Sequence, residues 1–144
     1  MSTQVRTLVA ELALTPIIVL APDMSVHAAA TLLVEADVPV VVVAATPPFE
    51  VTERDIVRAY VAMVDPESAV GELEHTRPAF VAPTTCITDV ASVMLATGRH
   101  ELVVFDGERA LGIVELNVVT AALWGPTTIV GALGAALHVH GEVP

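Results

Sequence analysis

The residues best suited to chemistry lie in one short segment, Thr52-Glu53-Arg54-Asp55. The apolar run before it predicts a strand and the pattern after it predicts a helix, so Thr52 stands at a strand-to-helix junction. Asp55 follows three residues later, on the same side of the first helical turn. A carboxylate there can accept both hydroxyls of a ribose, while the free N–H groups of the helix start and Arg54 favour a phosphate. The alternative is that Thr52 and Asp55 form only a helix-capping pair.

Other reactive side chains in the sequence give weaker signals. A zinc site needs three or four converging ligands, so five scattered histidines and one thiol predict no metal site. Cys86 stands at a predicted helix start, where the corresponding residue of the repeat described below is Ser25, and we interpret it as structural. Arg99 and His100 precede a predicted strand and either meet a phosphate or lie in a surface turn. Because no acid, base and nucleophile converge, we expect no enzyme.

Composition limits the partners and the setting of the chain. The net charge is −11, there is no lysine, and no basic stripe is present, which argues against a nucleic-acid partner. The longest uncharged apolar stretches, Val38–Ala45 and Thr127–Val139, are shorter than the roughly 18 to 20 residues of a membrane-spanning helix. A single cysteine agrees with a reducing compartment, so we expect a cytoplasmic protein. An apolar fraction of 54% and a mean hydropathy of +0.72 predict a homo-oligomer that buries a helical face.

An internal repeat organises the sequence. Five pieces recur in the same order: an X-Pro segment, a helix start, a helical pattern, an apolar run, and a strand that precedes a helix. The paired segments are residues 15–19 and 77–81, 22–26 and 83–87, 28–34 and 89–95, 40–43 and 102–105, and 49–52 and 112–115. The offset of 61 to 63 residues throughout predicts two copies of one β-α-β-β-α unit.

Local patterns place the elements within each copy. Ser25 is expected to cap a helix over Val26–Ala36, whose apolar residues recur at spacings of three and four. The apolar run Val40–Ala44 is typical of a strand covered on both faces. Asp106-Gly107 predicts a hairpin between strands at residues 102–105 and 110–115. Second helices are expected at residues 53–63 and 116–123, and flanking helices at residues 3–14 and 127–137.

The predicted architecture is α/β with mixed α+β character. It consists of two pseudo-twofold-related β-α-β-β-α repeats with flanking N- and C-terminal helices. We expect an N-terminal linker helix at residues 1–14, a first repeat at 15–67, a second repeat at 68–124, and a C-terminal helix and tail at 125–144. The apolar segment 127–137 is expected to be a packing or dimer helix, and the tail contains His138 and His140.

The order of these pieces resembles a tandem cystathionine-β-synthase (CBS) domain pair, also called a Bateman module. The resemblance covers about residues 8–124. Its most specific piece is Phe49–Ile56, the last part of which follows the family's Gly-apolar-apolar-Ser/Thr-x-x-Asp signature. It implies a non-catalytic regulatory module that dimerises, binds AMP, ADP, ATP or S-adenosylmethionine in a cleft between the copies, and signals to an unknown protein partner. It would place the ribose on Thr52 and Asp55, with Arg54 near the phosphate, and the base against Thr15, Ile18, Val38, Pro39 and Val40.

Several positions depart from the family pattern. Phe49 stands where the family has glycine, and its ring would either crowd the cleft or cover an adenine. Glu50 stands at a strand position that is normally apolar. In the second copy, Glu115 and Val118 replace the Ser/Thr and Asp of the signature. At most one nucleotide site is therefore expected, and the alternative is a ligand-free structural or dimerisation module with degenerate sites.

Overall fold

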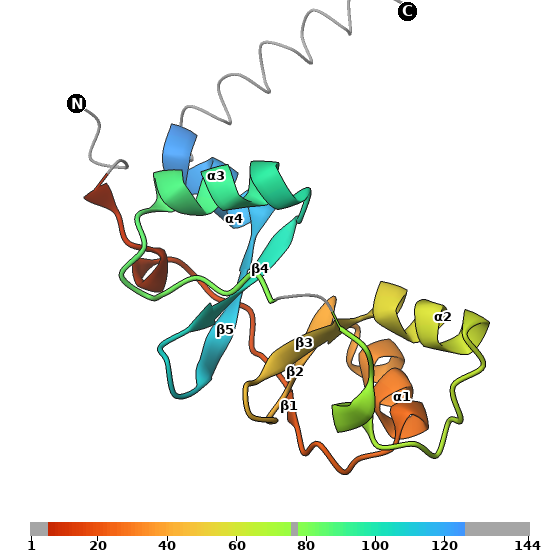
Figure 1. Cartoon of the computed structure of the whole chain (residues 1–144). Coiled ribbons are helices and arrows are strands. Elements are labelled where there is room, and N and C mark those ends of the chain that lie inside the picture. The colour runs from red at the N-terminus through yellow and green to blue at the C-terminus, as the bar shows by residue number, and fades with distance from the viewer. Residues whose placement is uncertain (1–5, 76–77, 126–144) are drawn as a thin grey trace, which may run out of the picture.

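The chain folds into two repeats that lie side by side, each with a small sheet and two helices (Figure 1). The computed structural model describes residues 6–75 and 78–125. The first repeat contains β1 (Val19–Leu20), α1 (Val26–Ala36), β2 (Val40–Val43), β3 (Phe49–Thr52) and α2 (Glu53–Val61). The second contains α3 (Ile87–Thr97), β4 (Glu101–Phe105), β5 (Ala110–Glu115) and α4 (Leu116–Trp124). Short 3-10 helices lie at η2 (Val9–Glu11) and η3 (Val70–Glu72). The predicted mixed α/β fold is confirmed.

The two copies have the same arrangement of paired strands. In the first sheet β1 runs parallel to β2, and β2 runs antiparallel to β3. In the second, β4 runs antiparallel to β5, and one parallel bridge between Val81 and Val104 stands where β1 would be. That bridge lies 61 residues beyond the pairing of Leu20 with Val43. The predicted repeat is thus present in the backbone as well as in the sequence.

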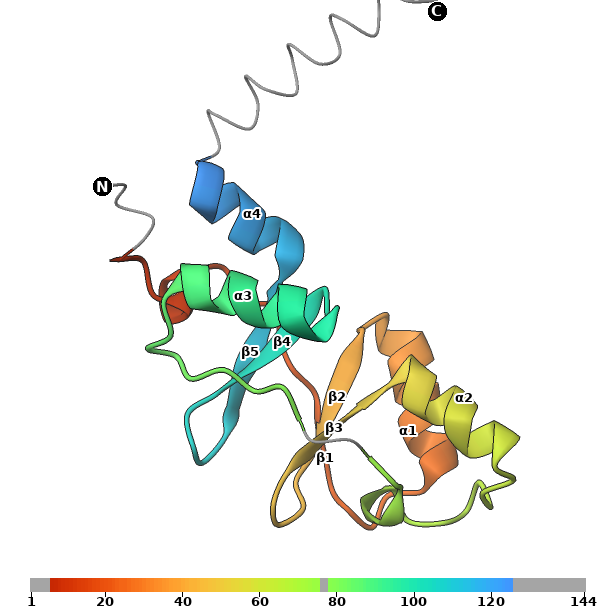
Figure 2. The same ribbon diagram turned by 45° about the horizontal axis from the view of Figure 1, so that its top comes forward.

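The interior is divided into three apolar clusters. One lies under α1 and α2, and a second lies under α3 and α4. The third joins the repeats: Val40 and Val42 of β2 pack with Val103 of β4 and Ile113 of β5. The two sheets therefore face each other in the middle of the molecule, with the helices outside them (Figure 2). Every residue of β2 is buried because alternate side chains reach the helices and the other repeat, which explains the unbroken valine run.

The first helices of the two copies differ in their N-caps. The Ser25 hydroxyl accepts a hydrogen bond from the Ala28 N–H at 3.1 Å and so caps α1 as expected. Cys86 is the N-cap of α3 and makes no side-chain cap bond. The α3 helix ends at Gly98 with φ of +68°, a conformation that costs other residues strain.

Replacing Ser25 with alanine is expected to lower the free energy of unfolding by about 1 kcal/mol, because the Ala28 N–H loses its partner. Urea unfolding followed by circular dichroism measures the change. Ser92→Ala is the matched control, since Ser92 is exposed in the interior of α3 and bonds only the Thr88 carbonyl. The control is expected to be neutral or slightly stabilising; equal losses in both variants would contradict the capping role.

The N-terminal segment differs from the expected helix. From residue 7 to residue 14 the only helical turn is Val9–Glu11, and Leu12 is already extended. Thr15 instead makes two backbone hydrogen bonds of 2.8 Å with Ile113 of β5. The following proline favours this extended conformation at Thr15. The segment runs so close to β5 that a Cβ on Gly112 would lie 2.9 Å from the Leu14 Cβ. Pairing with the second repeat thus overrides the local helical pattern.

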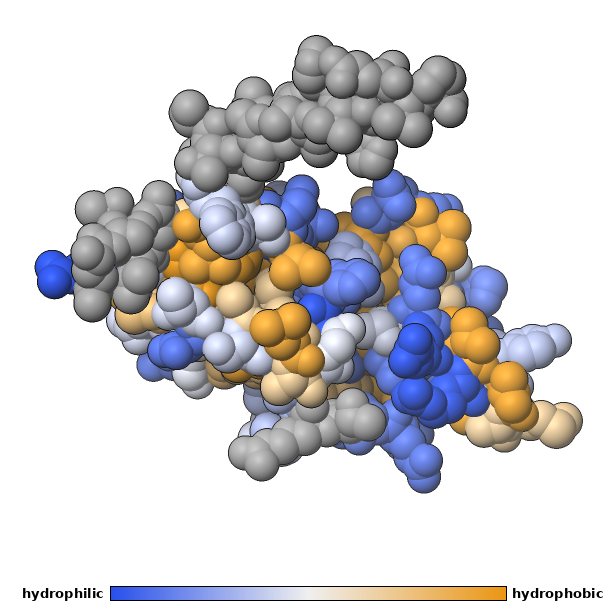
Figure 3. All heavy atoms as spheres, turned by 90° about the horizontal axis from the view of Figure 1, so that it is seen from above, coloured by the Kyte–Doolittle hydropathy of each residue, from blue (hydrophilic) through white to orange (hydrophobic). Residues whose placement is uncertain are grey.

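The outer surface carries apolar side chains on both repeats. Exposed examples are Val34, Val57 and Val61 on α1 and α2, and Leu95 and Trp124 on α3 and α4. Figure 3 shows hydrophobic surface on both halves of one face, with hydrophilic residues between them. Of the described helices, none combines the length and the apolarity needed to cross a membrane. The expected helix at 127–137 and the histidines of the tail lie outside the described residues.

Candidate functional site

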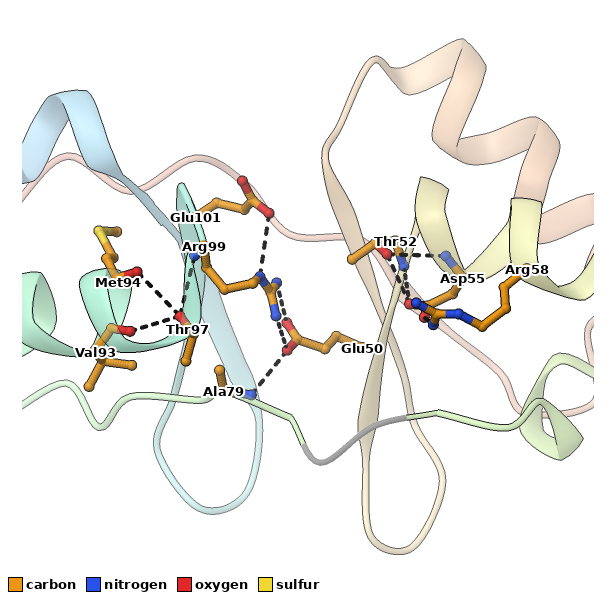
Figure 4. A network of polar contacts seen from close by, with 10 residues as sticks. All are labelled: Glu50, Thr52, Asp55, Arg58, Ala79, Val93, Met94, Thr97, Arg99 and Glu101. Atoms are coloured by element: carbon orange, nitrogen blue, oxygen red, sulfur yellow. Dashed lines mark hydrogen bonds and ion pairs between the residues drawn. The ribbon is translucent and has the colours of Figure 1, made fainter.

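A cleft of about 640 Å³ opens between the repeats, beside the junction of β3 and α2. Its first wall consists of Thr52 and the first turn of α2. Its second wall comes from the other repeat, where α3 ends and β4 begins. Figure 4 shows Glu50, Thr52 and Asp55 on one side and Thr97, Arg99 and Glu101 on the other. The lining residues are Pro39, Glu50, Thr52, Glu53, Arg54, Asp55, Arg58, Thr97, Gly98, Arg99, His100 and Glu101.

Thr52 and Asp55 form a reciprocal capping box at the start of α2. The Thr52 Oγ1 accepts from the Asp55 N–H at 3.3 Å, and the Asp55 Oδ2 accepts from the Thr52 N–H at 2.8 Å. The Thr52 hydroxyl also donates to Asp55 Oδ2 at 2.9 Å. The capping interpretation therefore holds in this structure. The same two side chains line the cleft, so capping does not remove them from a binding surface.

Asp55 keeps part of its hydrogen-bonding capacity. Its Oδ1 accepts from Arg58 Nη1 at 3.0 Å, and the side chains of Asp55 and Arg58 are 13% and 58% exposed. A carboxylate offers about four acceptor positions, and the three bonds to Thr52 and Arg58 leave about one. One ligand hydroxyl fits this position directly. A second requires the exposed Arg58 side chain to move, which costs little because exposed ion pairs are weak.

An ion pair between the repeats joins the two walls of the cleft. Arg99 donates to both oxygens of Glu50, from Nη1 to Oε1 at 2.8 Å and from Nη2 to Oε2 at 3.1 Å. Glu50 Oε1 also accepts from the Ala79 N–H at 3.0 Å. The side chains of Glu50 and Arg99 are 6% and 23% exposed. The hydrogen bonds with Glu50 are the main cause that raises the pKa of Arg99, against the opposing effect of burial. Such paired, two-point contacts between charged groups are among the strongest in proteins.

Glu101 adds a second carboxylate near the same guanidinium. Its Oε1 lies 3.7 Å from Arg99 Nε. Burial nevertheless raises the pKa of Glu101, because desolvation of its carboxylate outweighs the attraction of Arg99. This part of the cleft is consequently rich in partly desolvated negative charge.

The cleft collects some of the residues proposed from the sequence and not others. Thr52, Arg54, Asp55 and Pro39 all line it. Thr15, Ile18, Val38 and Val40 are not among its lining residues. The Thr15 hydroxyl donates to Glu115 at 2.9 Å, Ile18 and Val38 pack against the core of the first repeat, and Val40 is buried between the sheets.

The wall supplied by the second repeat was only partly foreseen. Arg99 and His100 were considered for a phosphate, whereas Thr97, Gly98 and Glu101 were not. The repeat itself carries the missing signal. Residues 99–101 stand 61 positions after residues 38–40 and so occupy, at the start of β4, the place that residues 38–40 occupy at the start of β2. The pairing of the two repeats brings this start of β4 against the start of α2.

The departures from the family signature have clear structural places. Phe49 is buried in the core of the first repeat and stacks on His75, with ring centroids 3.7 Å apart and planes 6° apart. Its ring is not part of the cleft lining. Glu50 faces the second repeat and is the one buried polar or charged residue among those described. In residues 6–75 and 78–125, no three His, Cys, Asp or Glu side chains converge as metal ligands.

Comparison with known proteins identifies the fold. No protein-family model and no curated protein matches the chain by sequence. A CBS-domain containing protein from Agrobacterium tumefaciens matches with a TM-score of 0.66 and 21% identity, over 81% of this chain and 98% of its own. A CBS domain protein from Pyrobaculum aerophilum, complexed with AMP, matches with a TM-score of 0.65 and 23% identity, over 77% and 88%.

A third solved structure carries a different adenosine ligand. It is the CBS domain pair of a protein in complex with 5′-methylthioadenosine and S-adenosyl-L-methionine. It matches with a TM-score of 0.66 and 19% identity, over 83% of this chain and 98% of its own. The two internal copies, their strand pairing and these matches agree, and the chain has the fold of a tandem CBS-domain pair.

Proposed function

We propose that the chain is a non-catalytic regulatory module that binds an adenosine compound in the cleft between its repeats. The observation that carries this proposal is the Thr52–Asp55 junction, which lies at a helix start and within a cleft built by both copies. CBS proteins of the same fold, complexed with AMP or with 5′-methylthioadenosine and S-adenosyl-L-methionine, support it. In this proposal the remaining acceptor position of Asp55 takes a ribose hydroxyl.

The proposed signal is a small change in the relative position of the two repeats. A ligand in the cleft would touch α2 of the first repeat and the α3–β4 connection of the second. A ligand shifts an equilibrium only by the difference between its affinities for the two arrangements. We propose that a protein partner senses this shift, and that the chain acts as a homodimer through the exposed apolar surface of its helices.

Replacing Asp55 with alanine is expected to weaken adenosine binding about tenfold or more, because charge-assisted hydrogen bonds are worth about 1.5–3 kcal/mol. Isothermal titration calorimetry with 5′-methylthioadenosine and AMP measures the affinity. Asp89→Ala is the matched control, since Asp89 lies in the first turn of α3 and outside the cleft. An affinity that is equal in wild type and Asp55→Ala would remove Asp55 from the site.

A second candidate is a structural or dimerisation module without a ligand. The Glu50–Arg99 ion pair favours it, because the Glu50 carboxylate and the Arg99 guanidinium are bonded to each other and not left for a ligand. This candidate predicts that no adenosine compound at millimolar concentration raises the melting temperature. The regulatory proposal predicts an increase, because binding to the folded state alone stabilises it.

A further inference from the structure

The cleft holds more negative than positive side chains. Its lining includes four carboxylates, at Glu50, Glu53, Asp55 and Glu101, and three guanidinium groups, at Arg54, Arg58 and Arg99. Two of the three cations are already engaged: Arg99 by Glu50 and Glu101, and Arg58 by Asp55. Of the described arginines in the lining, Arg54 alone has no carboxylate within 4.0 Å.

Arg99 is poorly available to a phosphate. Figure 4 shows its guanidinium directed at Glu50 and Glu101. Two of its five N–H donors are bonded to Glu50 and its Nε faces Glu101, so a phosphate would meet a guanidinium whose charge is already balanced by carboxylates. Moving the guanidinium away from Glu50, whose side chain is 6% exposed, is opposed because it would leave a buried carboxylate without its cation. Glu50 therefore engages Arg99, which is the least exposed of the three arginines that line the cleft.

The remaining carboxylates add direct repulsion. Glu53 stands at the start of α2, beside the position that an anion would take at the helix N-terminus. Glu101 lies on the opposite wall and is partly desolvated, which weakens solvent screening of its charge. A polyphosphate between these walls would face two carboxylates with one uncommitted arginine. A neutral nucleoside or a sulfonium nucleoside would not meet this penalty.

We infer that the cleft discriminates among adenosine compounds by charge, accepting neutral or cationic 5′ groups and rejecting di- and triphosphates. Glu53 and Glu101 are the specificity-determining residues, and Glu50 acts through Arg99. This inference rests on the proposed adenosine-binding function. The expected order of affinity is 5′-methylthioadenosine above AMP, and AMP above ATP. We expect at least a tenfold difference between 5′-methylthioadenosine and ATP, which corresponds to about 1.4 kcal/mol.

The test is calorimetric titration of the full chain with 5′-methylthioadenosine, AMP and ATP at fixed low ionic strength. The ratio of the affinities for 5′-methylthioadenosine and ATP is then measured in Glu53→Gln combined with Glu101→Gln. This ratio is expected to fall at least fivefold, because repulsion of the triphosphate is reduced. Glu35→Gln is the control, since Glu35 is exposed on α1 and outside the cleft, and it should leave the ratio within twofold of wild type.

The outcomes separate this inference from the function on which it rests. Wild-type protein that binds ATP as tightly as 5′-methylthioadenosine, or tighter, overturns the charge selection and leaves adenosine binding standing. A ratio that is unchanged in the double variant also overturns it. If none of the three compounds binds, the proposed function and the inference fail together.

Discussion

Replacing Glu50 with alanine is expected to lower the free energy of unfolding by about 3 kcal/mol, the lower end of the range for breaking a buried ion pair. The lower end applies because the Arg99 side chain is 23% exposed and water can screen its charge after the change. The variant also removes the acceptor of the Ala79 N–H. Chemical denaturation followed by circular dichroism measures the loss.

A double-mutant cycle isolates the contact between the repeats. Arg99→Ala and the double variant with Glu50→Ala complete the cycle, and a coupling energy of about 1–3 kcal/mol is expected for groups in direct contact. Glu50→Gln serves as the shape-matched comparison, because it keeps an acceptor for Ala79 and loses only the charge. Additive losses in the cycle would show that the ion pair does not stabilise the arrangement of the two repeats.

Replacing Phe49 with alanine is expected to cost about 3–5 kcal/mol of unfolding free energy, as for other buried phenylalanines. The ring is 2% exposed and fills the core of the first repeat, so truncation leaves a cavity. It also removes the ring on which His75 stacks, so the segment that follows η3 loses its aromatic contact with the core of the first repeat.

Two variants sharpen the Phe49 experiment. Phe105→Ala is the matched control, because Phe105 is only partly buried and contacts Phe80 at a centroid distance of 5.0 Å. It should cost less than half as much. The affinity of Phe49→Ala for 5′-methylthioadenosine, measured below its melting temperature, should match wild type, since Phe49 does not line the cleft. A large gain in affinity would mean that the ring obstructs the site.

Local sequence patterns were sufficient for the repeat and its elements. The Ser25 cap and the hairpin at Asp106 depend on neighbours a few residues away, so turn and capping chemistry identify them. The valine run of β2 is identified by its continuous apolarity, which is typical of a strand covered on both faces. In the hairpin, the Asp106 carboxylate accepts from the N–H groups of Glu108 and Arg109, and these bonds hold its pKa below the usual range.

Features that depend on pairing between the copies were harder to predict. The segment before Thr15 was expected to be a helix, but it forms a single helical turn and leads into backbone hydrogen bonds between Thr15 and Ile113, 98 residues away. The partnership of Glu50 with Arg99 spans 49 residues, and each residue alone resembles a surface charge. The Thr52–Asp55 motif was visible because it is local, whereas the opposite wall of the cleft exists only after the two copies meet.

Amide chemical-shift mapping with 5′-methylthioadenosine tests the central claim, that the cleft beside the β3–α2 junction binds the ligand, most directly. The account predicts that the largest shifts occur at residues 52–55 of the first repeat and 97–101 of the second, because these segments form the two walls. Asp89 on the first turn of α3 is an internal reference that should stay unchanged. Spectra without any shift at millimolar ligand, or with shifts confined to the outer faces of the helices, would contradict it.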